Sequence, residues 1–216
     1  LNVKAGTDAA LAMAMGHVIL KEYYIDKETP YFKEYAKEFT DMPFLVRVED
    51  INGAVQPGRF LNAKDLGRQE EGSDFQMVLI DEITNEIVIP NGTMGERHTN
   101  PQKWNLRLEN RDTGAKIDPR LSVFDQREDV TIVKLPYFGD EEHEGVIERA
   151  IPTITVQTVD GPVKVTTVYD LILANYGIDR GIGGEVAKAY TDDTPYTPTW
   201  QEKITGVKAD IAIATA

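Results

Sequence analysis

The chain has 216 residues, no cysteine and a formal net charge of -13 at pH 7. The lack of cysteine excludes disulfides, thiolate metal ligands and a cysteine nucleophile within these residues. The acidic balance opposes binding of free nucleic acid, so a polyanionic ligand needs a locally arranged pocket. The longest apolar run, near residues 9–20, is too short to span a bilayer, and the composition is that of a globular chain.

The first predicted helix covers about residues 7–24. Thr7 is placed to cap it, and Asp8 lies in the first turn, where a carboxylate suits the positive end of the helix dipole. The residues that follow leave no polar stripe, so we expect burial on most sides. Gly16 indicates a close approach by another backbone.

A second helix is predicted for "TPYFKEYAKEF", with Thr29 as cap and Pro30 in the first turn. Its spacing predicts an amphipathic, peripheral helix. The apolar face consists of Tyr31, Phe32, Tyr35, Ala36 and Phe39.

From about residue 44 to residue 165 the pattern predicts short strands and turns. "QMVLIDEITNEIVI" indicates a hairpin, and Asp160-Gly161 is the turn signal of another. In "WNLRLE" the side chains expected to point inward are Trp104, Leu106 and Leu108. This middle part has the character of an insertion.

Helices return near the end of the chain. Thr167 and Asp170 have capping-box spacing, and Thr197 is placed to cap a later helix that Gly206 ends. From Lys208 another helix begins and stops within about two turns, short of an ordinary helix. Both ends therefore look like cuts, and we interpret the chain as a contiguous slice of a larger protein.

The opening stretch has the chemistry of a nucleotide site. If "LNV" ends a strand, then strand, loop and helix form the edge of an open parallel sheet, where α/β proteins hold nucleotides. Gly6 lets the backbone approach a ligand, and Thr7 with the first helical N–H groups can donate to a phosphate. Asp8 suits ribose hydroxyls or the donors of a guanine edge. In the alternative interpretation, Thr7 and Asp8 only cap the helix.

Seven sequence motifs follow one another along the chain. They are "GTDAALAMAMGHVILKE", "FTDMPFLV", "PNGTMGERH", "KWNL", "LPYFG", "VTTVYDLILANYGIDRG" and "YTPTWQEKITGV". In this combination the chain resembles the catalytic alpha subunits of membrane-bound respiratory nitrate reductases, which belong to the molybdopterin oxidoreductase superfamily. The resemblance covers nearly the whole chain.

The resemblance implies an α/β fold in which this chain is a slice of a multi-domain enzyme. Residues 1–45 would be part of the cofactor-binding α/β domain, and residues 46–166 a β-rich insertion. Residues 167–216 would return to the helical part of that α/β domain.

The implied cofactor is molybdenum held by two molybdopterin guanine dinucleotides, with Gly6, Thr7 and Asp8 contacting the guanosine end of one of them. The family's iron–sulfur ligands and the aspartate that binds molybdenum lie upstream of this motif. We therefore assign this chain no catalytic residue and no metal ligand, and we expect it to be inactive by itself.

The implied reaction is reduction of nitrate to nitrite by oxygen-atom transfer. Electrons would come from quinol through an iron–sulfur subunit and a membrane haem subunit, and no nucleic acid is involved. The resemblance implies a peripheral position on the cytoplasmic face of the membrane, although some relatives face outward. Two alternatives stay open: a reductase of chlorate, perchlorate or selenate from the same superfamily, and a non-catalytic assembly module.

The remaining candidate residues have structural interpretations. We expect His17 to be a hydrogen-bonded core histidine, and His98 and His143 to be solvated in polar loops. The acidic run at residues 139–148 lacks the spacing of a calcium loop, so a solvated loop is expected. Trp104 and Trp200 are expected to anchor the core.

Overall fold

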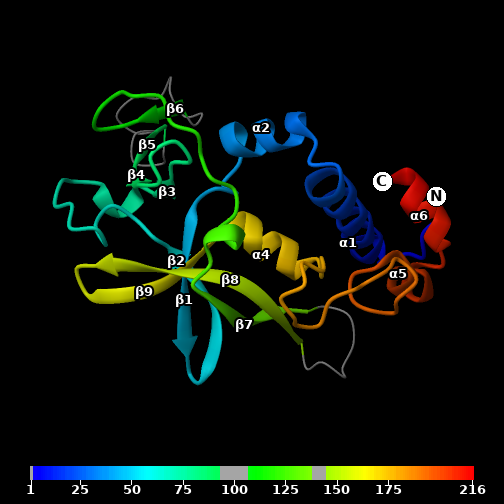
Figure 1. Cartoon of the computed structure of the whole chain (residues 1–216). Coiled ribbons are helices and arrows are strands. Elements are labelled where there is room, and N and C mark those ends of the chain that lie inside the picture. Colours follow the sequence, from blue (N-terminus) through cyan, green and yellow to red (C-terminus); the bar gives the residue numbers. More distant parts are fainter. Residues whose placement is uncertain (1, 93–106, 138–144) are drawn as a thin grey trace. The chain divides into compact units, whose positions relative to one another are not determined.

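The computed structural model describes residues 2–92, 107–137 and 145–216 (Figure 1). Helices at both ends of the chain flank a middle part of antiparallel strands, which confirms the mixed α/β class. The chain divides into two compact units, described here one at a time. Unit 1 comprises Leu1–Phe32, Thr131–Ile151 and Leu171–Ala216, and unit 2 comprises Lys33–Val130 and Pro152–Asp170.

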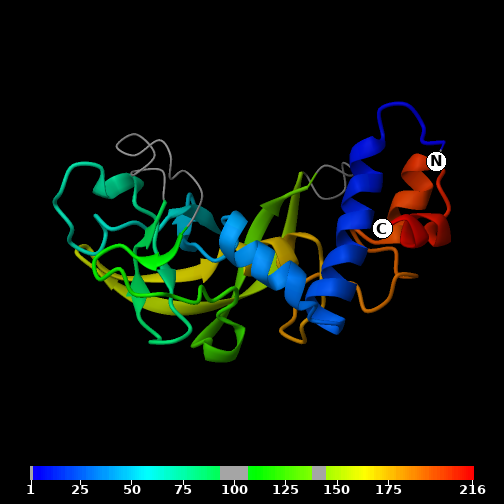
Figure 2. The same cartoon turned by 90° about the horizontal axis from the view of Figure 1, so that it is seen from above.

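Helices α1, α5 and α6 form one end of unit 1 and lie side by side in both views (Figures 1 and 2). α1 covers Asp8–Ile19 and continues as the π-helical segment η1, Leu20–Asp26. α5 covers Pro198–Thr205 and α6 covers Ala209–Thr215. The apolar contact between them is made by Leu11, Val207 and Ala212, with Val3 and Met15 packed at its edge. These bounds confirm the helices predicted at both ends of the chain.

Burial of α1 is less complete than its composition predicts. Ala9 and Ala12 are exposed and Met13 is half-buried, because the neighbouring helices cover one side of α1 only. Gly16 does mark a close approach, but the neighbour is a side chain: a Cβ there would lie 2.3 Å from Tyr176 Cε1. The expectation of a second backbone at this point was therefore wrong.

An aromatic cluster forms another part of the core of unit 1. Trp200 Nε1 donates a hydrogen bond to the Tyr137 hydroxyl at 3.1 Å, and the Tyr196 ring meets the Trp200 ring edge-on at 5.1 Å. Trp200 is 9% exposed, which confirms its role as a core anchor. The Tyr196 hydroxyl donates to the Pro136 carbonyl at 3.4 Å, at the end of strand β7, Asp129–Pro136. The neighbour of β7 in the sheet is β8, Val146–Thr158, and both strands contain residues of both units.

Unit 2 contains most of an antiparallel sheet. Strands β2, β1, β9 and β8 are neighbours in that order. β1 covers Leu45–Ile51, β2 covers Ala54–Phe60 and β9 covers Gly161–Thr167. β8 and β9 form the hairpin predicted from the Asp160-Gly161 signal, with Thr158 paired to Gly161 and the positive φ of 110° on that glycine. The core against this sheet includes Leu45, Leu61, Val78, Ile80, Val156 and Val165.

Two short strand pairs complete unit 2. β3, Leu79–Ile80, and β4, Ile87–Val88, form the predicted hairpin, and β5, Pro90–Asn91, pairs with β6, Arg107–Asn110. Leu108 packs inward against Leu79, Val88 and Ile117. Trp104 and Leu106 lie outside the described residues. Two 3-10 turns, η2 (Ser73–Phe75) and η4 (Phe124–Gln126), lie in the connecting loops.

Helices α2, Pro30–Phe39, and α4, Val168–Asn175, each contribute residues to both units. α2 is peripheral as predicted, and Ala36 is its one buried residue. The aromatic side of α2 is open to solvent in this chain, since Tyr31, Tyr35 and Phe39 are 69%, 50% and 53% exposed.

Candidate functional site

The loop before α1 is a tight turn. Its backbone closes through a hydrogen bond from the Thr7 N–H to the Lys4 carbonyl at 3.2 Å. Gly6, at the third position of the turn, has φ of 79°, the value that a type II turn requires and that glycine adopts without strain. No atom lies within 4 Å of a Cβ built on Gly6. The turn geometry therefore accounts for glycine here, and the space beside it is open.

This turn is attached to the end of α5 and not to a strand. The Lys4 N–H donates to the Thr205 carbonyl at 3.0 Å, and the Lys4 stem passes 3.5 Å from a Cβ built on Gly206. Asn2–Lys4 has no strand conformation, and the pairings between the described strands are antiparallel. The condition for the expected parallel-sheet edge, a strand ending before the turn, is not met by residues 2–4, and a helix terminus supplies the acceptor for the Lys4 N–H instead.

The Thr7 side chain does not cap α1. Its hydroxyl donates back to the Lys4 carbonyl at 2.7 Å and accepts no hydrogen bond from an N–H group of the helix. The N–H groups of Asp8 and Ala9 donate to no described group. The Asp8 side chain is exposed and likewise has no partner within the described residues. The interpretation of Thr7 as a simple side-chain cap was therefore wrong.

The turn thus presents complementary groups on one exposed surface. Free N–H groups at a helix N-terminus attract anions, whereas the two oxygens of Asp8 accept hydrogen bonds from N–H or O–H donors. A ligand that carries both a phosphate and a hydrogen-bond-donating base or sugar matches this pair. Gly6, Thr7 and Asp8, the residues predicted from the sequence, are therefore adjacent and accessible.

His17 lies further along α1 and belongs to the core. It is 1% exposed, its Nδ1 lies 2.6 Å from the Tyr176 carbonyl, and the Tyr190 ring packs edge-on against it at 5.9 Å. Burial lowers the pKa of His17, and the charges of Lys21 and Arg149 add to this effect. The prediction of a hydrogen-bonded core histidine is confirmed.

Arg149 is a buried charge in unit 1 that sequence reasoning missed. Its side chain is fully buried, with Nε donating to the Ala174 carbonyl at 3.0 Å and Nη2 donating to the Pro195 carbonyl. Nη1 has no hydrogen bond, and the nearest described carboxylate is Glu185 at 3.9 Å. Burial lowers the pKa of Arg149 to about 10. By donating to the carbonyls of Ala174 and Pro195, Arg149 holds both ends of the segment that leads from α4 to α5.

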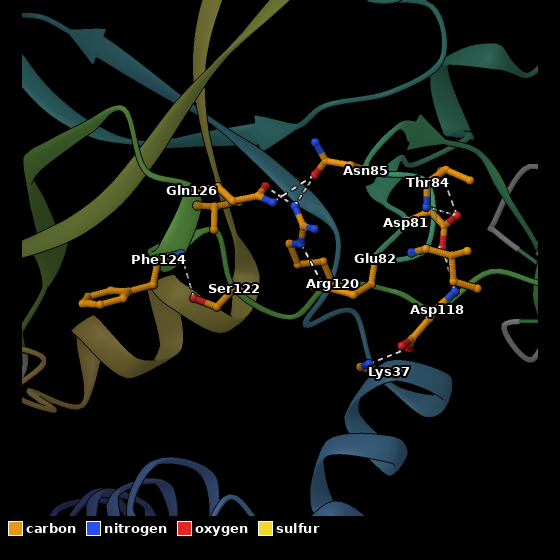
Figure 3. A network of polar contacts seen from close by, with 12 residues as sticks. Lys37, Asp81, Glu82, Thr84, Asn85, Asp118, Arg120, Ser122, Phe124 and Gln126 are labelled. Carbon is orange, nitrogen blue, oxygen red and sulfur yellow. Dashed lines mark hydrogen bonds and ion pairs between the residues drawn. The ribbon is translucent and has the colours of Figure 1, made fainter.

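Unit 2 holds a larger polar network around Asp81 and Arg120 (Figure 3). The Asp81 carboxylate accepts bonds from the Thr84 hydroxyl at 2.8 Å and the Asp118 N–H at 2.8 Å. The Arg120 guanidinium donates to Glu82, Asn85 and Gln126. Hydrogen bonds hold the pKa of Asp81 below its usual value although burial opposes this. These groups are occupied by one another, so the network joins loops and leaves little capacity for a ligand.

Asp170 plays a comparable structural role at the start of α4. Its carboxylate accepts from the Thr167 hydroxyl at 2.9 Å, the Ser122 hydroxyl at 2.6 Å and the Val123 N–H at 2.9 Å. The Asp170 N–H donates to the Thr167 hydroxyl at 3.1 Å, which confirms Thr167 as the cap of α4. The reciprocal bond of Asp170 comes from the Thr167 hydroxyl and not from its backbone N–H, so the predicted capping box forms only in part. The long-range contacts to Ser122 and Val123 carry no local sequence signal.

Within the described ranges, the side chains form no group of three or more histidine or acidic residues that could hold a metal ion. His98, His143 and most of the acidic run at residues 139–148 lie outside those ranges. No helix within these described ranges is both long enough and apolar enough to cross a membrane.

Comparison with known proteins identifies relatives of the whole chain. The nitrate reductase alpha chain of Bacillus subtilis is 46% identical over 216 residues, which is all of this chain and 18% of that protein. The respiratory nitrate reductase 1 alpha chain of Escherichia coli is 41% identical, over 96% of this chain and 18% of that protein. This chain belongs with the nitrate reductase alpha chains.

The chain spans about 18% of the length of these nitrate reductase alpha chains. A more distant relative is the chlorate reductase subunit alpha of Ideonella dechloratans, 33% identical over 97% of this chain and 15% of that protein. No protein-family model matches the chain. The nitrate reductase resemblance inferred from the sequence motifs is confirmed.

Proposed function

We propose that this chain is part of a nitrate reductase catalytic subunit that reduces nitrate to nitrite. The observation that carries the proposal is the identity of 46% to a nitrate reductase alpha chain along the entire sequence. The lower identity of 33% to a chlorate reductase favours nitrate over other oxoanions. When bound, molybdenum supplies two-electron oxygen-atom transfer.

The contribution of this chain is to bind the guanosine end of a molybdopterin guanine dinucleotide through Gly6, Thr7 and Asp8. The described residues fit such a group: the Gly6 turn faces open space, the first N–H groups of α1 have no acceptor, and the Asp8 carboxylate has no donor. The N–H groups would stabilise negative charge, and Asp8 would accept hydrogen bonds from guanine or ribose. These residues hold and orient a cofactor and take no part in the oxygen transfer.

The proposed domain arrangement follows the same resemblance. Residues 1–45 and 167–216 would belong to one α/β cofactor domain, with residues 46–166 as a β-rich insertion. Direct contacts between the two terminal segments support this, since Lys4 bonds Thr205 and Leu11 packs on Val207. Because only one part of the cofactor site is assigned to this chain, we expect it to show no nitrate turnover alone.

The respiratory relatives suggest a membrane-associated complex for the whole protein. We propose partners that carry electrons from quinol, namely an iron–sulfur subunit and a membrane haem subunit. These partners would attach the complex to the cytoplasmic face of the membrane. The proposed form of the cofactor in the catalytic subunit is molybdenum held by two molybdopterin guanine dinucleotides.

The test is cofactor content in the complete enzyme carrying Asp8→Ala or Asp8→Asn. Direct recognition predicts less molybdenum and less released guanine nucleotide per folded subunit, in the order Ala below Asn below the parent, because each lost charge-assisted bond contributes roughly 1.5–3 kcal/mol. Asp210→Ala is the matched control, since Asp210 is an exposed first-turn carboxylate of α6. Full nucleotide occupancy in Asp8→Ala would refute the assignment of this residue.

Substrate assignment is tested separately by comparing kcat/KM of the complete enzyme for nitrate, chlorate, perchlorate and selenate. Nitrate should give the highest value. A higher value for another oxoanion would reassign the protein within the superfamily, and absence of turnover with full cofactor content would favour the assembly role.

A further inference from the structure

The turn that carries Gly6, Thr7 and Asp8 depends on one backbone acceptor from a distant part of the sequence. Helix α5 ends at Thr205, whose carbonyl is one of the terminal carbonyls that a helix leaves without an internal partner. It accepts the Lys4 N–H at 3.0 Å. The Lys4 carbonyl in turn accepts both the N–H and the hydroxyl of Thr7. The position of the turn is thus set through a single peptide unit.

The Thr205 acceptor is itself held by a buried side-chain network. Thr205 and Gln201 are both fully buried, and the Thr205 hydroxyl donates to Gln201 Oε1 at 2.5 Å. Gln201 Nε2 donates to the carbonyls of Pro198 at 3.0 Å and Val207 at 2.8 Å. The Thr205 hydroxyl also accepts the Val207 N–H at 3.0 Å.

These bonds use the hydrogen-bonding capacity of the Gln201 amide in a setting closed to water. Buried networks in which every member has a partner are rigid, because any local shift leaves a buried group without one. The bonds from Gln201 Nε2 also fix the chain on both sides of Gly206, whose φ of 78° turns the backbone out of α5. The direction of the Thr205 carbonyl is therefore over-determined.

We propose that Gln201 and Thr205 are positioning residues for the cofactor turn. By fixing the Thr205 carbonyl they hold Lys4, and through Lys4 they present Thr7 and Asp8 to the guanosine end of the dinucleotide. The inference rests on the function proposed above and extends it to two residues that are buried and contact no ligand themselves.

The test uses Thr205→Val and Thr205→Ser in the complete enzyme. Valine preserves shape but removes the hydroxyl, whereas serine retains it. Two quantities are measured: amide hydrogen exchange at Lys4 and Thr7, the two hydrogen-bonded amides of the turn, with the cofactor removed, and guanine nucleotide per folded subunit. Thr205→Val should raise exchange at the Lys4 and Thr7 amides about tenfold and lower nucleotide content, and Thr205→Ser should restore both towards the parent.

The matched control is Thr197→Val. Thr197 is also a fully buried threonine of the same helix, but it caps the opposite end by accepting the Trp200 N–H at 3.1 Å. Thr197→Val should lower stability and leave exchange at the Lys4 and Thr7 amides unchanged. If Thr197→Val and Thr205→Val alter the turn and the nucleotide content equally, the two residues of the proposal are merely structural and the inference is overturned.

Two further outcomes separate this inference from the proposed function. If Asp8→Ala loses nucleotide but Thr205→Val does not, the inference alone fails; if Asp8→Ala keeps its nucleotide, the proposed role of Asp8 in cofactor binding fails. Because Thr205→Val could prevent folding, the parent enzyme gives an independent check. Its Lys4 amide should be protected to a similar degree as the Val207 amide, and rapid exchange at Lys4 beside a protected Val207 would overturn the proposal.

Discussion

Helices α1 and α4 both begin beside a threonine and carry an aspartate in the first turn, but these polar groups have different partners. At α4, Thr167 and Asp170 exchange hydrogen bonds, and the carboxylate also accepts from Ser122 and Val123. At α1 the Thr7 hydroxyl turns back to Lys4, and Asp8 is exposed without a described partner.

The comparison separates two uses of similar residues. The carboxylate of Asp170 is filled by donors from the chain itself, so its role is to join a loop to a helix start. The carboxylate of Asp8 can still accept hydrogen bonds and the first N–H groups of α1 can still donate them, and a ligand site requires such unused groups. Partner occupancy in the folded chain, rather than residue type, distinguishes a structural carboxylate from a binding one.

The largest effect on stability is expected for Asp170→Ala. The change leaves the donors of Thr167, Ser122 and Val123 without their acceptor in a fully buried position. We expect the free energy of unfolding to fall by about 3 kcal/mol or more. Denaturant unfolding of the complete subunit measures this. A loss as small as that of Asp8→Ala would contradict the distinction drawn between the two helices.

Local signals predicted much of the fold. The caps at Thr167 and Thr197 and the hairpin signal at Gly161 all depend on neighbours within a few residues, and the structure confirms each of them. Such features follow from backbone geometry and short-range hydrogen bonds, which sequence spacing encodes directly.

Features that depend on distant partners could not be predicted. Tyr176 fills the space beside Gly16 from 160 positions away, and the Lys4 N–H finds a helix end instead of a strand. For the candidate site, the sequence identified Gly6, Thr7 and Asp8 but not the direction of the Thr7 hydroxyl. Nor did it reveal the buried support from Gln201, because that support is set by the tertiary packing of α5.

His17 extends the comparison to the pH dependence of stability. Unlike Asp8, it is a buried polar group of α1, and its Nδ1 lies within hydrogen-bond distance of the Tyr176 carbonyl. Burial lowers its pKa from 6.5 in the folded state, so the unfolded chain binds the proton more readily. Its contribution to stability is therefore retained above pH 6.5 and lost as the pH falls below that value. The Tyr176 carbonyl lies 2.6 Å from its Nδ1, the Tyr190 ring packs against it, and the charges of Lys21 and Arg149 act on it.

Melting temperatures of the parent and His17→Gln between pH 5 and pH 8 test this expectation. The parent should lose stability towards low pH more steeply than His17→Gln. His98→Gln is the control, since the sequence predicts a solvated side chain there. Parallel curves for the parent and His17→Gln would show that His17 does not contribute to the pH dependence.

Gly6 allows the turn requirement to be separated from access by the ligand. Alanine at φ of 79° should cost about 1 kcal/mol, whereas asparagine tolerates this region better. Gly53→Ala is the matched control, because Gly53 has φ of 80° and equally open space. If the ligand approaches Gly6, both Gly6→Ala and Gly6→Asn should lower guanine nucleotide content. If nucleotide content is normal in Gly6→Asn, the glycine serves the turn alone.

The smallest effect on stability is expected for Asp8→Ala measured without cofactor. Asp8 has no described partner to lose, so the change should remove only its attraction to the helix dipole, roughly 0.3–1 kcal/mol. Asp210→Ala at the start of α6 should cost at least as much, because the Asp210 carboxylate also accepts the Ile211 N–H at 2.9 Å. With the cofactor bound, the two variants should diverge, since only Asp8 would lose bonds to the ligand as well. Melting temperatures of both variants, with and without cofactor, measure this difference. Equal shifts in both states would mean that Asp8, like Asp210, acts only on its own helix.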